Sequence, residues 1–397
     1  MTNIVTITAN DYCHSVFDGT HATPKPCPNG YKLVTSKNIT SDGINISDAY
    51  FISEQDYFEI NKRSKVCQWD ILFSMIGTVG NLYLEENSNI DYAIKNIGVF
   101  SCQDEFKAKW LFYYLQSPMA KNHIKRFLNG AVQKFLSLEQ LRNFPILPFE
   151  KDKIPIVEIL SALDKKIALN KQINARLEEM AKTLYDYWFV QFDFPDANGK
   201  PYKSSGGEMV FDETLKREIP KGWAATTLKD FLTIKNGKDH KLLSDGKYTV
   251  YGSGGAMRSA DDYLFEGKSV LIPRKGTLNN VMYVNEAFWT VDTMFYTEMK
   301  QDFFAEYVFY SIKDIDFNKF NLGTGVPSMT SSILYSLKMI RPSDYLLKSF
   351  EDTLKPIFLK ITNNENENQH LTQLRDFLLP MLMNGQISVI CSGARDG

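Results

Sequence analysis

Two glycine–threonine pairs, Gly77–Thr78 and Gly276–Thr277, each follow a predicted strand and could bind a ligand at close range. Glycine leaves the backbone N–H groups open, and a small hydroxyl beside it suits contact with a phosphate or a base edge. Asn81 and Asn280 lie three residues beyond the threonines, and an asparagine amide can form a bidentate pair with adenine. Such dipeptides often mark only a tight hairpin. Their occurrence in two matched places favours a nucleic-acid ligand.

Other candidate ligand-binding residues are polar and basic side chains in segments between predicted elements. In the first half of the chain they are Thr20, His21, Thr23, Lys25, Lys37, Asn38, Gln133 and Lys134. In the second half they are Lys235, Lys238, His240, Lys241, Ser253, Arg274, Lys275 and Ser328. The basic side chains form local clusters, through which a chain without an overall basic field could contact a polyanion. For any one lysine, a solvated surface position is the simpler interpretation.

The tests for enzyme chemistry mostly fail. The glycine-rich segment 251–257 matches neither a dinucleotide-binding nor a P-loop pattern, so we expect a turn there. Asp292, Glu298 and Lys300 loosely resemble the carboxylate cluster of metal-dependent nucleases, but these residue types are common and their spacing is flexible. The Asn-Pro-Pro-aromatic tetrapeptide of base methyltransferases is absent. We therefore predict no catalytic residue, bound cofactor or metal site in this chain.

The composition predicts an ordinary soluble protein with two to three domains. The 397 residues are 44% hydrophobic and 23% charged, with a net charge of −2, which argues against a general polyanion binder. The five cysteines are scattered and never spaced as Cys-x-x-Cys, so we expect neither a disulfide framework nor zinc. No signal sequence or membrane-spanning run is apparent, and we expect a cytoplasmic protein without a membrane anchor.

An apolar ladder with steps of three and four residues occurs twice, at a constant offset of 194 residues. It comprises Ile156, Leu160, Leu163, Ile167, Leu177, Met180 and Leu184, and then Phe350, Leu354, Ile357, Ile361, Leu371, Leu374 and Leu378. This spacing is typical of a coiled-coil seam and predicts two long helices that pair with each other. Asn170 and Asn364 interrupt the two ladders at matching positions, where a buried asparagine fixes the register. We expect a kink or an early end at Pro380.

The repeat extends beyond the helices. Segment 70–84 aligns with 269–283, a strand followed by a Gly-Thr turn, and 128–141 resembles 322–334. The order of parts is a globule at 1–150, a helix at 151–192, a linker and second globule at 193–345, and a helix at 346–391. We predict an α+β fold in which two α/β globules are joined by two long antiparallel coiled-coil helices, with a pseudo-twofold internal repeat.

With these features the sequence resembles the DNA-specificity (S) subunits of type I restriction–modification enzymes. Residues 160–194 and 371–389 are similar to the two conserved helical regions of that family, and 217–223 and 323–330 resemble the entry to and exit from its second domain. The entry motif has no counterpart before the first globule, which we interpret as a short start. The resemblance covers nearly the whole chain.

The resemblance implies a function for each part. The globules would be target recognition domains, each reading one half of a split site in double-stranded DNA. The helices would set the spacer and dock two methyltransferase (M) subunits, which recruit restriction (R) subunits. The chain itself would be non-catalytic within a complex that is a DNA adenine methyltransferase and site-specific endonuclease, with S-adenosylmethionine, ATP and Mg on the partner subunits.

The candidate partner-binding residues are Tyr185, Trp188, Phe189, Arg375 and Leu379. The aromatic residues at the end of the first helix are most simply core residues where that helix docks on a globule, and a partner-binding face is the alternative. Two rival functions remain open. One is a coiled-coil adaptor whose globules bind proteins without DNA specificity, and the other is a single-chain nuclease or methyltransferase that uses Asp292, Glu298 and Lys300.

Overall fold

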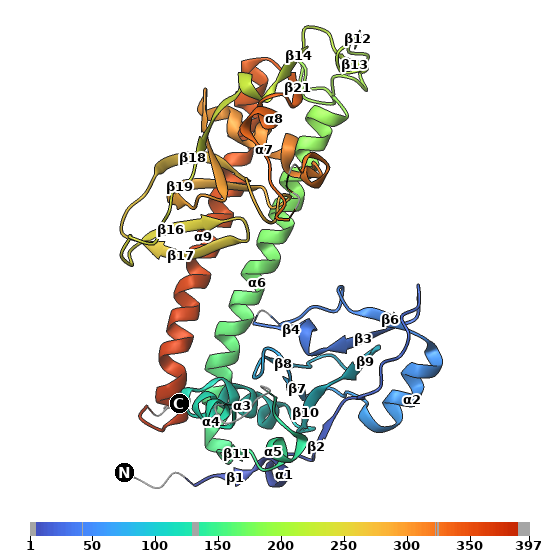
Figure 1. Cartoon of the computed structure of the whole chain (residues 1–397), viewed down its shortest axis with the longest axis vertical. Helices are drawn as coiled ribbons and strands as arrows, with labels where there is room; N and C mark the ends of the chain where they lie inside the picture. The colour runs from blue at the N-terminus through green and yellow to red at the C-terminus, as the bar shows by residue number, and fades with distance from the viewer. Residues whose placement is uncertain (1–4, 42, 129–134, 322, 324, 388–397) are drawn as a thin grey trace, which may run out of the picture. The chain divides into compact units, whose positions relative to one another are not determined.

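The computed structural model describes residues 5–41, 43–128, 135–321, 323 and 325–387 (Figure 1). The chain divides into two compact units. Unit 1 comprises Met1–Leu169 and Asn366–Gly397, and unit 2 comprises Asn170–Glu365. Helices α6 (Ile154–Tyr185) and α9 (Asp344–Met383) both cross this division, so each long helix contributes one part to each unit.

Unit 1 is a mixed α/β globule. Its strands are β1 (Ile7–Thr8), β2 (Ser15–Asp18), β3 (Tyr31–Thr35), β4 (Ile39–Thr40), β5 (Gly43–Ile44), β6 (Tyr50–Ile52), β7 (Asp70–Ser74), β8 (Leu82–Leu84), β9 (Tyr92–Lys95), β10 (Ile97–Ser101) and β11 (Pro145–Ile146). Its helices besides α6 and α9 are α1 (Ala9–Tyr12), α2 (Glu54–Ser64), α3 (Glu105–Gln116), α4 (Pro118–Leu128) and α5 (Leu138–Arg142). The main sheet has the order β2-β10-β7-β8, and a second sheet has the order β6-β3-β9. Every residue of β7 and β10 is buried, which fits their continuous apolar runs.

Unit 2 repeats this plan with longer strands. They are β12 (Met209–Asp212), β13 (Arg217–Pro220), β14 (Ala224–Thr227), β15 (Leu232–Asn236), β16 (Tyr248–Gly252), β17 (Gly255–Ala260), β18 (Phe265–Pro273), β19 (Met282–Thr290), β20 (Met294–Met299) and β21 (Lys338–Arg341). The short helices are α7 (Ala305–Lys313) and α8 (Ser331–Tyr335). Six strands form one sheet in the order β15-β20-β18-β19-β16-β17. The mixture of helices and strands and the two long helices agree with the predicted fold class.

The two long helices run antiparallel within each unit. In unit 1, Lys166 pairs with Glu367 at 3.1 Å and Asp164 with Arg375 at 2.9 Å, so residue numbers rise on α6 as they fall on α9. In unit 2, Asn174 contacts Asn364, and Tyr185 lies 6.4 Å from Phe350 between ring centroids. The predicted pairing of the two helices is therefore observed.

The apolar ladders form only part of the helix interface. Leu160, Phe350 and Leu354 are fully buried, and Asn170 and Asn364 are each 1% exposed, as a register-setting asparagine requires. Met180 and Leu374, which are related by the 194-residue offset, are instead 58% and 45% exposed. Their assignment to the buried seam was wrong. The spacing of apolar residues shows which face of a helix they share, but not whether another part of the fold covers that face at each position.

Pro380 does not end the last helix, so of the two expected effects, a kink or an early end, the early end is wrong. Helix α9 continues three residues further, to Met383, and Gly385 follows with φ +67°. Leu379, Leu382 and Met383 are buried in the core of unit 1. Burial of this last turn compensates for the N–H that proline lacks.

Candidate nucleic-acid interface

The two Gly-Thr turns have the same construction. Strand β7 leads to Gly77 with φ +78°, and strand β18 leads to Gly276 with φ +87°. After each turn the chain returns as an antiparallel strand, β8 beside β7 and β19 beside β18. Each turn also forms an isolated bridge to a later segment, Ile76 with Phe135 and Lys275 with Ser328. Because positive φ favours glycine, the backbone itself explains why glycine recurs at both places.

The two asparagines predicted to read adenine each form a hydrogen bond to a backbone carbonyl. The Asn81 amide nitrogen donates to the Ile39 carbonyl at 2.9 Å, and that of Asn280 donates to the Ser253 carbonyl at 3.0 Å. Both side chains are partly buried, and each bond uses one of the two N–H donors of its amide. The two asparagines therefore hold the turns in place in each unit, and base reading by them stays a prediction.

In unit 2 the turn gathers most of the predicted candidates. The backbone N–H groups of Arg274 and Lys275 donate to the Thr293 carbonyl at 2.8 and 3.1 Å, and Gly276 N–H donates to the Pro327 carbonyl at 3.0 Å. A Cβ atom at Gly276 would lie 2.7 Å from Ser253 Oγ. Thr277 and Lys275 are exposed. The structure thus brings Ser253, Arg274, Lys275, Gly276, Thr277, Asn280 and Ser328 to one place.

The remaining candidates of unit 2 lie along β15 and the segment after it. Lys235 pairs with Glu298 at 3.4 Å, and Lys241 is 3.9 Å from Asp239, whereas the Lys238 side chain is exposed. The guanidinium of Arg258 donates to the carbonyls of His240 at 3.3 Å and Leu243 at 2.6 Å, and so fixes the path of this segment. Sequence reasoning missed Arg258 because it comes from β17, distant in sequence.

In unit 1 the loop after β2 forms a second polar cluster. His21 Nε2 lies 3.0 Å from Asp18 Oδ2, and His21 Nδ1 lies 2.8 Å from Asn96 Oδ1. Lys95 donates to the Thr23 hydroxyl, and Thr20 forms a parallel bridge with Lys95. Lys95 and Asn96 were not predicted, since only the pairing of separate strands places them beside this loop. Lys25 in the same loop is exposed.

The neighbouring candidates Lys37 and Asn38 of unit 1 differ in exposure. Lys37 is exposed, whereas Asn38 is 7% exposed and its Oδ1 accepts from the Thr35 N–H at 2.8 Å and the Thr35 hydroxyl at 2.9 Å. Asn38 therefore closes the 3-10 turn Ser36–Asn38, and its amide is not available to a ligand, which corrects its assignment. Gln133 and Lys134 lie outside the described residues.

Most of the partner-binding candidates are buried. Trp188 and Phe189 are 5% and 3% exposed in the core of unit 2, where their ring centroids lie 5.6 and 4.9 Å from that of Phe350. Tyr185 packs on the same cluster, and Leu379 is buried in unit 1. Burial removes Trp188, Phe189 and Leu379 from a partner surface and supports their interpretation as core residues, whereas Tyr185 is only partly buried. Arg375 binds Asp164 and Asp376 and remains partly exposed.

The carboxylates considered for metal-dependent cleavage do not form a metal site. Glu298 pairs with Lys235, and Asp292 and Lys300 are exposed. No group of three or more His, Cys, Asp or Glu residues that could hold a metal ion occurs in the described part of the chain. Among the same residues, no helix is long and apolar enough to span a membrane.

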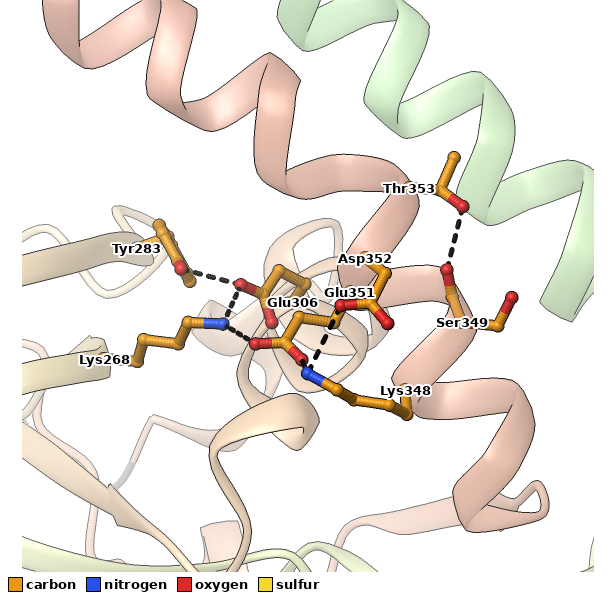
Figure 2. Close-up of polar contacts among 8 residues, drawn as sticks. All are labelled: Lys268, Tyr283, Glu306, Lys348, Ser349, Glu351, Asp352 and Thr353. Carbon is orange, nitrogen blue, oxygen red and sulfur yellow. Dashed lines mark hydrogen bonds and ion pairs between the residues drawn. The ribbon is translucent and has the colours of Figure 1, made fainter.

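A buried ionic cluster connects the sheet of unit 2 to the long helix α9 (Figure 2). The ammonium group of Lys268 on β18 pairs with Glu306 on α7 at 2.7 Å and also with Glu351 on α9. The Tyr283 hydroxyl donates to Glu306 at 2.8 Å, and Lys348 pairs with Glu351 at 2.6 Å. Burial acts to lower the pKa of Lys268, but the two carboxylates outweigh it and the net pKa is raised. Glu306 Oε2 is buried and has no hydrogen-bond partner among the described residues.

The sequence matches the family model for the type I restriction–modification DNA specificity domain over residues 22–179 and again over 220–373. The chain belongs to this family. It is a DNA-binding specificity subunit whose two repeated segments contain the target recognition domains, as the resemblance of its helical motifs indicated.

Individual relatives agree with this assignment. The chain is 24% identical over 323 residues to the specificity subunit of the type I restriction enzyme MjaIX from Methanocaldococcus jannaschii, covering 72% of this chain and 71% of the relative. It is 22% identical over 402 residues to the HindI specificity subunit from Haemophilus influenzae, covering 80% and 86%. The crystal structure of a type I S subunit from M. genitalium has the same fold, with a TM-score of 0.57 at 17% identity over 96% of this chain and 97% of that one.

Proposed function

We propose that this chain reads a bipartite DNA site, with one half-site contacted by each globule. The observation that carries the proposal is the repetition of one turn geometry, a positive-φ glycine after a buried strand, in both units. Around Gly276 the exposed Lys275 and the partly exposed Arg274 supply cationic groups for phosphates or guanine edges. In unit 1 the exposed Lys25 and the partly buried Lys95 supply cationic groups at the separate loop that contains His21.

The long helices set the distance between the two half-sites. Helix α6 has 32 residues and is therefore about 50 Å long at 1.5 Å per residue. This length corresponds to roughly 15 base pairs of B-form DNA at 3.4 Å each. The spacer is then a property of the helices and the half-sites are a property of the globules.

We propose that two M subunits dock on two exposed apolar patches of the helices. Leu374 and Phe377 are 45% and 60% exposed in unit 1, and Met180 and Tyr187 are 58% and 36% exposed in unit 2. Leu374 and Met180 are related by the repeat, so one kind of partner could use both. Exposed apolar side chains at matched positions are typical of an interaction surface.

Catalysis would then take place on the partner subunits. The M subunits would bind S-adenosylmethionine and methylate adenine, and R subunits recruited through them would use ATP and Mg to cleave DNA. This chain would supply positioning only, in the cytoplasm where its target DNA lies. The four described cysteines are all free thiols, in accord with that compartment.

Matched insertions test the role of the helices. Seven residues added to α6 and seven to α9 preserve the heptad phase and lengthen both helices by about 10 Å. The complex with M subunits should then methylate sites whose spacer is longer by roughly three base pairs, while the half-sites stay the same. An unchanged spacer would refute the proposal that the helices act as a ruler.

A further inference from the structure

Strand β18, which carries the reading turn of unit 2, is linked to α9 by an ion pair of the largely buried Lys268 side chain. Lys268 lies six residues before Arg274 on the continuous strand β18, which ends directly before the turn. Its ammonium group binds Glu306 from α7 and Glu351 from α9, and these side chains are only 18%, 4% and 10% exposed. Strand β18, helix α7 and the long helix α9 are therefore joined at the ammonium group of Lys268 (Figure 2).

Unit 1 has a different contact at the corresponding positions. The alignment of 70–84 with 269–283 places Trp69 opposite Lys268, and the alignment of FKAKWLFYY at 106–114 with FFAEYVFYS at 303–311 places Lys109 opposite Glu306. Lys109 lies over the Trp69 ring at 5.0 Å and pairs with Glu105 and Glu86. The position of Glu351 corresponds to Val157, which is 1% exposed. At these described positions, a direct ionic link from the strand to the long helix occurs in unit 2 and not in unit 1.

Such a cluster is better suited to fixing geometry than to adding stability. Desolvating one ammonium and two carboxylates is costly, and apolar side chains of similar volume often stabilise a core equally well. An ion pair with a charged hydrogen bond, in contrast, has a defined direction and distance. The cluster also holds one negative charge more than Lys268 neutralises, and Lys348 at the surface of α9 offsets it through Glu351.

We propose that Lys268 and Glu351 are positioning residues for the second half-site: their ion pair fixes β18, and with it the turn from Arg274 to Thr277, at a set orientation on α9. The inference rests on the proposed function, because it assumes that this turn reads DNA and that α9 is part of the ruler. Loss of the pair leaves the turn intact but allows it to shift on the helix, so that both the second half-site and the spacer are read less strictly.

The substitution Glu351→Gln tests the link without removing the Lys268–Glu306 pair. Its matched control is Asp352→Asn, the next residue on the same helix, which also pairs with Lys348, at 3.3 Å, but does not contact Lys268. A second variant, Lys268→Met with Glu306→Gln and Glu351→Gln, removes the buried lysine–carboxylate charges together and leaves Lys348, whose side chain is 53% exposed, so that no buried charge lacks a partner. Lys268→Arg keeps the charge and is the conservative variant.

Each variant is assembled with its M subunits, and its affinity is measured for the natural duplex, for duplexes with one changed base pair in either half-site, and for spacers one base pair shorter or longer. For Glu351→Gln and for the neutral variant we expect discrimination at the second half-site and between spacers to fall about tenfold or more. Discrimination at the first half-site should be unchanged, and the control and Lys268→Arg should behave as the unsubstituted chain.

A folded Glu351→Gln or neutral variant that reads the second half-site and the spacer as strictly as the unsubstituted chain would overturn the inference. Equal loss at both half-sites would also overturn it, because that result indicates a general loss of structure. If the unsubstituted complex itself shows no dependence on two separated half-sites, the proposed function fails instead, and the two failures are thereby distinguished.

Discussion

The amide nitrogen of Asn364 donates to Asn174 Oδ1 at 2.7 Å, and both side chains are buried between the helices of unit 2. Asn174 in turn donates to the Ile361 carbonyl at 3.3 Å. In unit 1 the residue offset by 194 from Asn174, Asn368, donates to the Ile167 carbonyl at 3.4 Å, and Ile167 is related to Ile361 by the same offset. The duplicated helix therefore contains duplicated polar contacts, which set the register of the pair in each unit.

Replacing Asn174 and Asn364 together by leucine should strengthen the helix pair but loosen its register. An apolar pair in place of a satisfied polar pair is neutral or stabilising by about 1 kcal/mol. Asn364→Leu alone leaves the buried Asn174 oxygen without its donor and should cost about 1–3 kcal/mol. Denaturant unfolding measures both effects, and spacer discrimination by the assembled complex should weaken in the double variant. A double variant that is less stable than either single variant would argue against this account.

Asp70, at the start of β7, should make unit 1 less stable as pH rises. Burial raises the pKa of Asp70 from 3.8 to about 6, so the folded state binds its proton more tightly than the unfolded state does. The favourable neutral form is lost between about pH 4 and pH 6, and a shift of this size corresponds to about 3 kcal/mol. Asp70→Asn should therefore raise the free energy of unfolding by about 1–3 kcal/mol at pH 8 and by little at pH 4. A benefit that is equal at both pH values would contradict the assignment.

Truncation of two residues of the second ladder should have different effects: one should lower the stability of the chain and the other should weaken binding of a partner. Phe350 is fully buried against Trp188 and Phe189, so Phe350→Ala should cost about 3–5 kcal/mol of stability through the cavity it leaves. Leu374 is 45% exposed, so Leu374→Ser should change stability by less than about 0.5 kcal/mol. It should nevertheless weaken the binding of an M subunit, as should Met180→Ser. Titration of the chain with purified M subunits checks this, and full binding by the double variant would remove these residues from the docking surface.

The two turn glycines should differ in their tolerance of alanine. A Cβ at Gly77 meets no atom of the described residues within 4 Å, so we expect Gly77→Ala to introduce mainly the strain of a positive φ, roughly 1 kcal/mol. At Gly276 the Cβ also clashes with Ser253 Oγ. Gly276→Ala should therefore weaken second half-site recognition more than Gly77→Ala weakens the first, and Ser253→Ala should partly restore it. Binding assays with separately altered half-sites measure this, and no rescue would show that the clash is not the cause.

The helices and the repeat were predictable from the sequence, because apolar periodicity and internal similarity can be recognised from residue types and their spacing alone. The positions of Gly77 and Gly276 were also predictable, since a strand followed by Gly-Thr has few backbone solutions. The roles of Asn81, Asn280 and Asn38 were not, because a side-chain amide binds whichever carbonyl the tertiary fold brings near. The same reason explains why Lys95, Asn96 and Lys268 were missed: each acquires its role from partners on other strands or helices.

The central claim is that two globules read two half-sites at a distance fixed by the helices. Mapping methylated adenines across a genome, in cells that carry the complex with the unsubstituted chain or with residues 1–150 exchanged for those of another family member, tests it most directly. We expect methylation at two defined half-sites separated by a spacer of constant length. The exchange of residues 1–150 should alter one half-site and leave the other half-site and the spacer unchanged. A single uninterrupted recognition sequence, or a change in both half-sites on exchange, would contradict the account.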